Sequence, residues 1–299
     1  MNEINIVDPK ENYNPKKDPN YTACLDHGFV RLVDVMGNDA AIVQAARVSY
    51  GQGTKSVRAD RGLIFYLMQH RHTTPFEMVE FKFHCRMPIF VARQWIRHRT
   101  ANVNEMSGRY SIMEEVFWSP SMDDLRKQST TNRQGSLEDE TIPIPEAKEI
   151  QKTFQEDQKH LYEEYQHYLK VGVAREVARG NLPLSIYTEW YWKIDLHNLL
   201  HFLELRLDAH AQKEIRVFAQ AMAEFVKKCC PVAWEAFEEH VLHASKFSRQ
   251  ESEILSQILS ENDLWDEVET RRIQQLENEE ASPPRIEREL ANLKRRLLR

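Results

Sequence analysis

A run of cationic and polar side chains at residues 97–110 is the part of the sequence best suited to chemistry. It reads RHRTANVNEMSGRY and begins with three consecutive side chains, Arg97, His98 and Arg99, that are cationic or can become so. Burying such groups without anionic partners is costly. Guanidinium groups present planar sets of donors that suit phosphate oxygens. The segment therefore predicts a pocket for a phosphorylated ligand.

Glu105, Ser107 and Arg109 follow at alternate positions of the same segment. Alternate side chains of an extended chain point to one side, so we expect these three to face the ligand together. The alternative is a surface salt-bridge cluster, which an isolated RHR triplet would more often form. Ser107 lacks the G-x-S-x-G surroundings of a nucleophilic serine, and spacing assigns it no base, so we prefer a substrate-binding role.

Composition limits the classes of function. The chain has 299 residues, a formal net charge of -6 and 41% hydrophobic residues, which is ordinary for a globular protein. The acidic balance argues against a nucleic-acid-binding module built on residues 97–109 and the basic C-terminus, which is the main rival interpretation. No apolar stretch approaches the ~20 residues that span a bilayer, and no signal peptide is evident. We expect a cytoplasmic protein without a membrane partner.

Cysteine, glycine and histidine patterns exclude several kinds of site. The cysteines have no C-x-x-C spacing, so we expect reduced thiols. The glycines form neither G-x-G-x-x-G nor a P-loop, so a nucleotide must be held in another way. The pairs His70/His72 and His197/His201 could each supply two metal ligands. Because no H-E-x-x-H pattern or cysteine partner accompanies them, we predict no metal.

The elements that position residues 97–110 follow from hydrophobic periodicity. Residues 28–36 predict a strand, and alternation over residues 81–87 predicts a second, half-buried strand. Pro88 ends that strand and starts a helix from Ile89 to about His98. Further helices are predicted at residues 40–48 (capped by Asp39), 61–69, 146–170, 175–179, 184–207 and 209–228.

Strands early in the chain and helices later favour an α+β architecture. We expect a flexible arm at residues 1–22, a main domain at 23–245 and a charged helical extension at 246–299. The extension is interpreted as a solvated helix, with a partner-binding helix as the alternative. Residues 108–118 are expected to be extended, and residues 123–145 to form an exposed loop.

The whole of residues 97–110 resembles the signature of flavin-dependent thymidylate synthases, the ThyX family, in which R-H-R is followed by N-E-x-S-x-R-Y. Asn102 stands where the family most often has Ser. The resemblance covers about residues 26–240. It is supported, in the same order along the chain, by residues 28–37, 45–49, 72–77, 88–95, 175–179 with 182–184, and 205–212.

This resemblance implies an antiparallel sheet packed with a large helical region and a methyltransferase that converts dUMP to dTMP. 5,10-Methylenetetrahydrofolate supplies the carbon and leaves as tetrahydrofolate, while NADPH reduces FAD and the flavin supplies the hydride. It also implies a homotetramer with active sites between subunits, so that FAD is bound without a Rossmann domain. A flavoprotein of this fold that has lost synthase activity is a second rival.

Site residues are carried over from the resemblance position by position. Arg206 would face the pyrimidine and favour ionisation at N3, because a fixed cation stabilises developing negative charge. Asp195 departs from the amide often found at its position. The implied FAD contacts are His72, Thr74, Arg97, His98, Arg99, Glu105, Asp195, His197, His201 and His210. The implied dUMP contacts are Gln94, Arg97, Glu105, Ser107, Gly108, Arg109, Arg179 and Arg206.

Overall fold

The computed structural model describes residues 16, 18–48, 57–129, 135–279 and 281–297. Most of the expected N-terminal arm, residues 1–15 and 17, lies outside the described part. The chain divides into two compact units, Met1–Leu242 and His243–Arg299. The first unit carries every candidate site residue.

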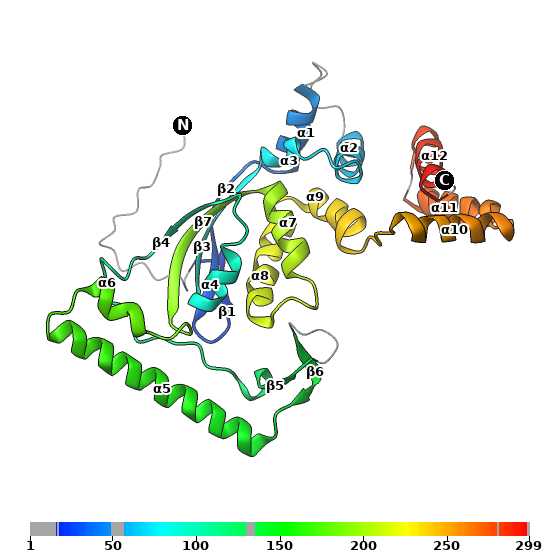
Figure 1. The fold of residues 1–299 in the computed structure, drawn as a ribbon. Helices are drawn as coiled ribbons and strands as arrows, with labels where there is room; N and C mark the ends of the chain where they lie inside the picture. Colours follow the sequence, from blue (N-terminus) through cyan, green and yellow to red (C-terminus); the bar gives the residue numbers. More distant parts are fainter. Residues whose placement is uncertain (1–15, 17, 49–56, 130–134, 280, 298–299) are drawn as a thin grey trace. The chain divides into compact units, whose positions relative to one another are not determined.

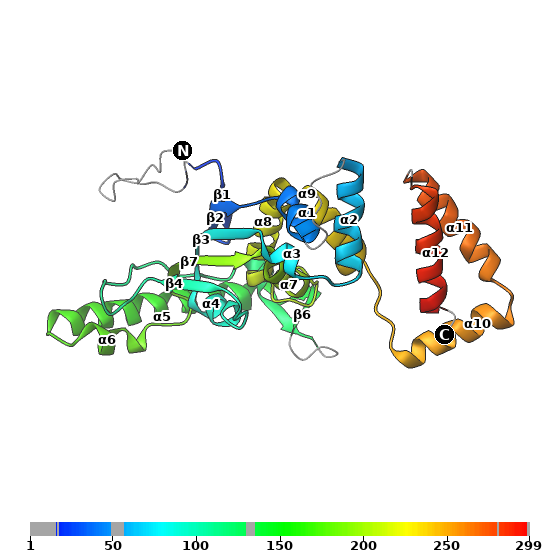
Figure 2. The same ribbon diagram turned by 90° about the horizontal axis from the view of Figure 1, so that it is seen from above.

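A five-stranded antiparallel sheet is the centre of the first unit. Its strand order is β1-β2-β3-β7-β4, which Figure 2 shows from above. The predicted strands at residues 28–36 and 81–87 are confirmed, and the fold is a mixed helical and antiparallel-sheet architecture. The strands are β1 (Tyr21–Cys24), β2 (Gly28–Met36), β3 (Glu80–Pro88), β4 (Asn102–Glu105) and β7 (Tyr187–Asp195).

Strand β7 corrects the helix predicted at residues 184–207. Trp190, Trp192 and Ile194 are buried, whereas Tyr191 and Lys193 between them are exposed, which is the period of a strand. Aromatic and β-branched side chains fit this pleated, half-buried surface. The helix begins only after the strand, as α7 (Leu196–Arg206).

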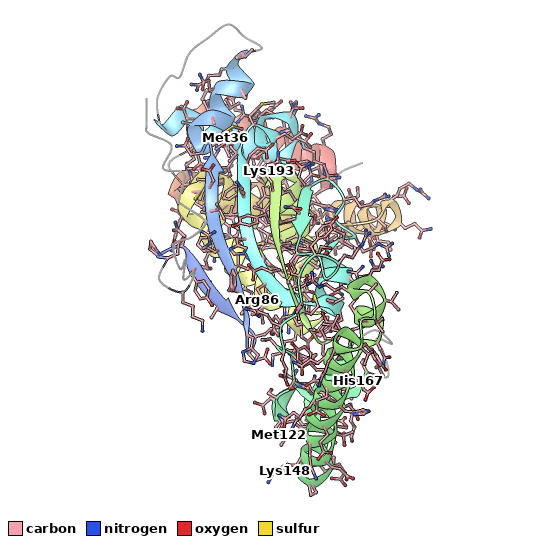
Figure 3. The ribbon with its side chains drawn as sticks, turned by 90° about the vertical axis from the view of Figure 1, so that its left-hand side faces the viewer. Met36, Arg86, Met122, Lys148, His167 and Lys193 are labelled. Carbon is pink, nitrogen blue, oxygen red and sulfur yellow. The ribbon has the colours of Figure 1, made fainter. Side chains whose placement is uncertain are left out.

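The core lies between one face of the sheet and three helices, α4 (Ile89–Trp95), α7 and α8 (Lys213–Cys229) (Figure 1). At its centre Trp95 is fully buried, with ring centroids 5.3 Å from Trp190 and 5.2 Å from Trp192. The opposite face of the sheet is polar. Arg86 and Lys193, labelled in Figure 3, lie on that face.

The remaining elements of the first unit include two corrections. Residues 123–145, expected to be a loop, contain a small antiparallel hairpin, β5 with β6. Residues 108–118, expected to be extended, contain a turn and one isolated bridge between Phe117 and Ile186. The elements are α1 (Asp39–Val48), α2 (Val57–Gln69), α3 (Thr74–Glu77), η2 (Met122–Asp124), β5 (Arg126–Gln128), β6 (Ser136–Thr141), α5 (Ile144–Lys170), α6 (Arg175–Ala178), η3 (Arg179–Asn181), α9 (Pro231–Phe237) and η4 (Glu238–Leu242).

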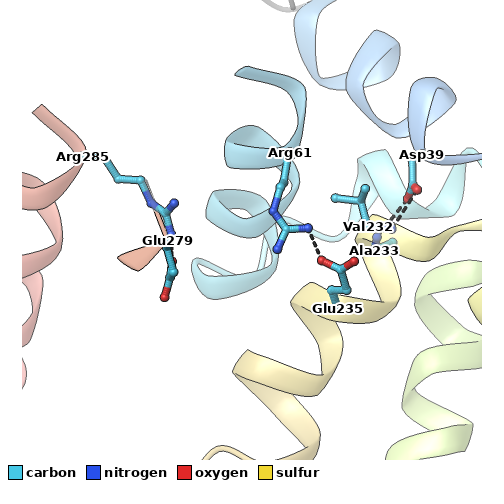
Figure 4. A network of polar contacts seen from close by, with 7 residues as sticks. All are labelled: Asp39, Arg61, Val232, Ala233, Glu235, Glu279 and Arg285. Carbon is cyan, nitrogen blue, oxygen red and sulfur yellow. Dashed lines mark hydrogen bonds and ion pairs between the residues drawn. The ribbon is translucent and has the colours of Figure 1, made fainter. Parts of the chain in front are cut away.

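Asp39 does not cap its own helix as predicted. Asn38 takes that role, because its Oδ1 accepts from the Ala40 amide at 3.0 Å. The Asp39 carboxylate instead accepts from the amides of Val232 and Ala233, each at 2.9 Å, at the N-terminus of α9 (Figure 4). A helix N-terminus attracts a carboxylate wherever tertiary structure places one, so sequence proximity misassigned the cap.

Replacing Asp39 with alanine should lower the free energy of unfolding by about 1–3 kcal/mol, because two partly buried amides lose their acceptor. Urea unfolding followed by circular dichroism measures the loss. Asp34→Ala on β2 is the matched control, since Asp34 is exposed and its loss should change stability by less than about 0.5 kcal/mol. Equal losses in the two variants would contradict the capping role.

The second unit consists of three helices, α10 (Arg249–Glu261), α11 (Trp265–Asn278) and α12 (Pro283–Leu297). A capping box starts α10, in which Ser248 and Glu251 bond to each other's backbone amides. An ion pair of 2.7 Å joins Arg285 to Glu279, both drawn in Figure 4. None of the helices in the described ranges is both long and apolar enough to cross a membrane.

Candidate active site

Residues 97–110 form three local structures rather than one extended segment. Helix α4 ends at Trp95, three residues earlier than predicted, and the chain turns before the edge strand β4. After Glu105 it turns again, because the amides of Tyr110 and Ser111 both donate to the Ser107 carbonyl at 3.0 Å. The expected alternation of Glu105, Ser107 and Arg109 on one side is therefore wrong. A serine hydroxyl that bonds nearby backbone favours such a turn, and Ser107 Oγ accepts from the Arg109 amide at 3.3 Å.

Arg206, at the end of α7, is held by His98. Its Nε donates to His98 Nε2 at 3.0 Å, and the His98 ring meets the Phe202 ring edge-on at 4.9 Å. Burial, followed by the charges of Arg206 and His201, lowers the pKa of His98 to about 4. His98 is therefore neutral at pH 7 and accepts at Nε2. No further hydrogen bond of the Arg206 side chain is found among the described residues, so its two terminal nitrogens can serve a ligand.

Acid should lower the stability of the fold through His98 in a defined pH range. The pKa of His98 is about 4 in the fold against an ordinary value of 6.5. As pH falls below about 6.5, the unfolded chain takes up the proton first, so stability is lost progressively down to about pH 4. Urea unfolding of wild type and His98→Gln between pH 7 and 4 measures this. The wild type should lose more stability than the variant. If the free energy of unfolding changed equally with pH in the two proteins, the lowered pKa of His98 would be contradicted.

A second group of cationic side chains surrounds Gly108. Arg109 Nε lies 3.2 Å from Glu176 Oε2, with both side chains more than half exposed. A Cβ at Gly108 would come within 3.1 Å of Arg179 Cδ and 3.0 Å of Met113 Sδ, so glycine lets the chain approach Arg179 closely. Exposed ion pairs contribute little, and an anionic ligand can therefore displace Glu176 at low cost.

Arg97 and Arg99 are the other guanidinium groups of the motif. Both are exposed, and neither has an acidic partner in the described part of the chain. Gln94 lies on α4, and its Oε1 is buried without a hydrogen-bond partner among the described residues. Because buried acceptors are normally paired, this atom is available for a ligand donor. Glu105 Oε1 already accepts from Thr188 Oγ1 at 2.6 Å.

The residues proposed to contact a flavin come from several elements. His201, on α7, has its ring centroid 6.3 Å from that of His98. His98, His201 and Arg206 therefore lie together, and we call them the Arg206 group. Thr74 begins the short helix α3, and the His72 ring lies 5.9 Å from Tyr66. His197 is half-buried in the first turn of α7.

Asp195 and His210 have partners within the chain. The Asp195 carboxylate caps α7 by accepting from the Asn198 amide at 2.9 Å and from its side chain at 2.7 Å. His210 is exposed, and its Nδ1 lies 2.9 Å from Asp208 Oδ1. Asp195 is thus used at the start of the helix that ends at Arg206. In the described ranges no cluster of three or more His, Cys, Asp or Glu side chains is placed to hold a metal ion.

A cavity of about 390 Å³ adjoins the motif along strands β3, β7 and β4. Glu105 and Thr188 both line it, together with Asn104, Tyr187 and Tyr191. Sequence reasoning missed Thr188 because it interpreted β7 as a helix. The available signal in the sequence was the alternation of apolar and charged residues at Trp192, Lys193, Ile194 and Asp195.

Comparison with known proteins places most of the chain in one family. The family model described as "Thymidylate synthase complementing protein" (Thy1) matches residues 31–232. A flavin-dependent thymidylate synthase of Wolbachia pipientis wMel is 55% identical over 235 residues, covering 79% of this chain and 82% of the relative. A flavin-dependent thymidylate synthase from Thermus thermophilus is 58% identical over 240 residues, which cover 79% of this chain and 85% of the relative.

A solved structure is similar as well. The UMP/dUMP methylase PolB from Streptomyces cacaoi, bound with 5-Br dUMP, aligns with a TM-score of 0.67 and 34% sequence identity. The alignment covers 74% of this chain and 99% of that protein.

Proposed function

Since the chain belongs to the Thy1 family, whose relatives are flavin-dependent thymidylate synthases, we propose that it methylates dUMP to dTMP with FAD, NADPH and 5,10-methylenetetrahydrofolate. The chain is thus a methyltransferase of the flavin-dependent class. 5,10-Methylenetetrahydrofolate gives up its methylene group and leaves as tetrahydrofolate, and FAD is the resident cofactor.

The observation that carries this proposal is the Arg206 group. Its guanidinium has two terminal nitrogens without a hydrogen-bond partner among the described residues, and its Nε is fixed by a neutral histidine that lies in the RHR motif. A fixed cation stabilises negative charge that develops on a pyrimidine, because the protein has already oriented it. We assign Arg206 this catalytic role at N3 of the dUMP ring.

The remaining residues fit a phosphorylated pyrimidine. Arg109 and Arg179 flank Gly108 and suit a phosphate dianion, which rewards planar sets of donors. Ser107 shapes the turn that carries Arg109. The unpaired Gln94 Oε1 suits a donor on the base, since it lacks any other partner among the described residues. We assign all five positions to dUMP binding, with Arg97 and Glu105 shared between substrate and cofactor.

The flavin is assigned to the neighbouring polar surface. Bound FAD, once reduced by NADPH, supplies the hydride for the methyl group. Arg97 and Arg99 suit its diphosphate because both are exposed and free of acidic partners in the described part of the chain. The other assigned contacts are His72, Thr74, His98, Glu105, Asp195, His197, His201 and His210. Asp195 contributes by capping α7.

We assign a homotetramer with active sites between subunits. Large apolar side chains are exposed around the Arg109 and Arg179 positions, where a second subunit would cover them. They include Tyr110 (76% exposed), Ile112 (55%), Val177 (65%) and Leu184 (63%). Covering such side chains is favourable. A cytoplasmic location without a membrane or nucleic-acid partner completes the proposal.

The test is an absorption spectrum of the purified protein, followed by anaerobic NADPH with and without dUMP and by a direct dTMP assay. Flavin absorbance that bleaches and dTMP that forms would support the synthase. Flavin without dTMP would favour a flavoprotein that has lost the activity. A colourless protein that takes up no FAD, yet binds polynucleotide with steep salt dependence, would favour the nucleic-acid rival.

A further inference from the structure

We propose that Thr188 is a positioning residue that holds Glu105 in the orientation required for ligand binding. The inference rests on the proposed function, because Glu105 is assigned to the dUMP and FAD contacts there. Thr188 lies on β7, outside every motif of the sequence, and acts on the ligand only through Glu105.

The register of the sheet brings the two side chains together. Glu105 pairs with Trp190 across β4 and β7, and Thr188 is two residues from Trp190 on the same face. The Met106 amide donates to the Glu189 carbonyl at 2.8 Å, which fixes the end of β4 beside Thr188. Thr188 Oγ1 then donates to Glu105 Oε1 at 2.6 Å. The contact therefore follows from backbone pairing rather than from a chance side-chain rotamer.

The two side chains differ in freedom. Thr188 is 2% exposed and β-branched, so burial and its own stereochemistry restrict its hydroxyl. Glu105 is exposed on an edge strand, where an unsupported glutamate samples several rotamers and loses that freedom when it binds. A short hydrogen bond from a fixed donor removes this cost before the ligand arrives. It also occupies one carboxylate oxygen and leaves Oε2 as the acceptor for the ligand.

The surroundings favour a binding role over a purely structural one. Both residues line the cavity of about 390 Å³ that adjoins the motif. A buried hydroxyl needs a hydrogen-bond partner, and here that partner is a carboxylate that itself lines the cavity.

Thr188→Val tests the proposal, because it keeps the shape and removes only the donor. We expect kcat/KM for dUMP to fall about tenfold to hundredfold, the range for losing a hydrogen bond to a charged group. The absorbance change of the flavin on dUMP addition should require correspondingly more dUMP. Thr188→Ser keeps the hydroxyl and should restore most of both. Thr153→Val on α5 is the matched control, since Thr153 is exposed and its hydroxyl bonds to the Glu149 carbonyl of its own helix.

A double-mutant cycle shows whether Thr188 acts through Glu105. In a Glu105→Ala background, Thr188→Val should have no further effect on dUMP binding, because the acceptor is already absent. Full, additive losses would overturn the proposal, as would wild-type kinetics in Thr188→Val or a variant that loses melting temperature without any change in kcat/KM. A wild-type protein that binds no FAD and forms no dTMP would instead refute the proposed function itself.

Discussion

Arg206→Ala will reduce dTMP formation about 10²–10³-fold while the protein still binds FAD. The guanidinium is the oriented cation assigned to the pyrimidine, and removing one such preoriented group typically costs this much in turnover. His98 Nε2 loses its donor in the variant, but the ring remains packed against Phe202. The arginines assigned to the FAD diphosphate are untouched. Single-turnover formation of dTMP and the flavin content of the purified variant measure the two effects separately.

Two further variants serve as controls for the loss of dTMP formation in Arg206→Ala. Arg206→Lys keeps a positive charge but loses the planar set of donors that both contacts His98 and faces the ligand, so it should recover only a small part of the activity. Arg249→Ala removes an exposed arginine of the second unit, paired with Glu253 in an i,i+4 contact, and should leave turnover unchanged. Turnover in Arg206→Ala equal to that in Arg249→Ala would refute the catalytic assignment.

The sequence was sufficient for the motif and for elements with a strong local period. Alternation over residues 81–87 and the helical spacing of residues 146–170 correspond to β3 and α5, with ends shifted by one or two residues. The failure at β7 has a physical cause. Tyr187–Asp195 runs directly into a helix, and no glycine or proline separates the two, so one apolar segment was interpreted as one helix.

Contacts between distant segments could not be predicted in this way. His98 and Arg206 are 108 positions apart, and Asp39 is 193 positions from Val232. Hydrophobic periods indicate which face of an element is buried but not which element covers it. The Arg206 group depends on α7 packing beside the end of α4, which is a property of the assembled core.

Trp95→Ala should lower the free energy of unfolding by about 3–5 kcal/mol, because the cavity left by a buried tryptophan does not fully collapse. Trp95 is fully buried, and its ring centroid lies 5.1 Å from Phe202 and 5.8 Å from Phe218. Phe202 in turn packs against His98, and the His98 amide donates to the Trp95 carbonyl at 3.0 Å. Loss of packing at Trp95 should therefore also loosen His98, which holds Arg206.

Urea unfolding followed by circular dichroism, at equal protein concentration, measures the stability of the Trp95 variants, and the dTMP assay measures the effect on the site. Trp95→Phe retains an aromatic ring and should lose less stability than Trp95→Ala. Trp265→Ala in the second unit is the matched control: that indole is partly exposed and bonds to Glu269 within α11, so dTMP formation should not change. Below about pH 6.5, acid should weaken dTMP formation more in Trp95→Ala than in wild type, because a loosened Phe202 exposes His98 and raises its pKa toward the ordinary value of 6.5. If dTMP formation fell equally with pH below about 6.5 in both proteins, Trp95 would support only the core, and His98 would be positioned independently of Trp95.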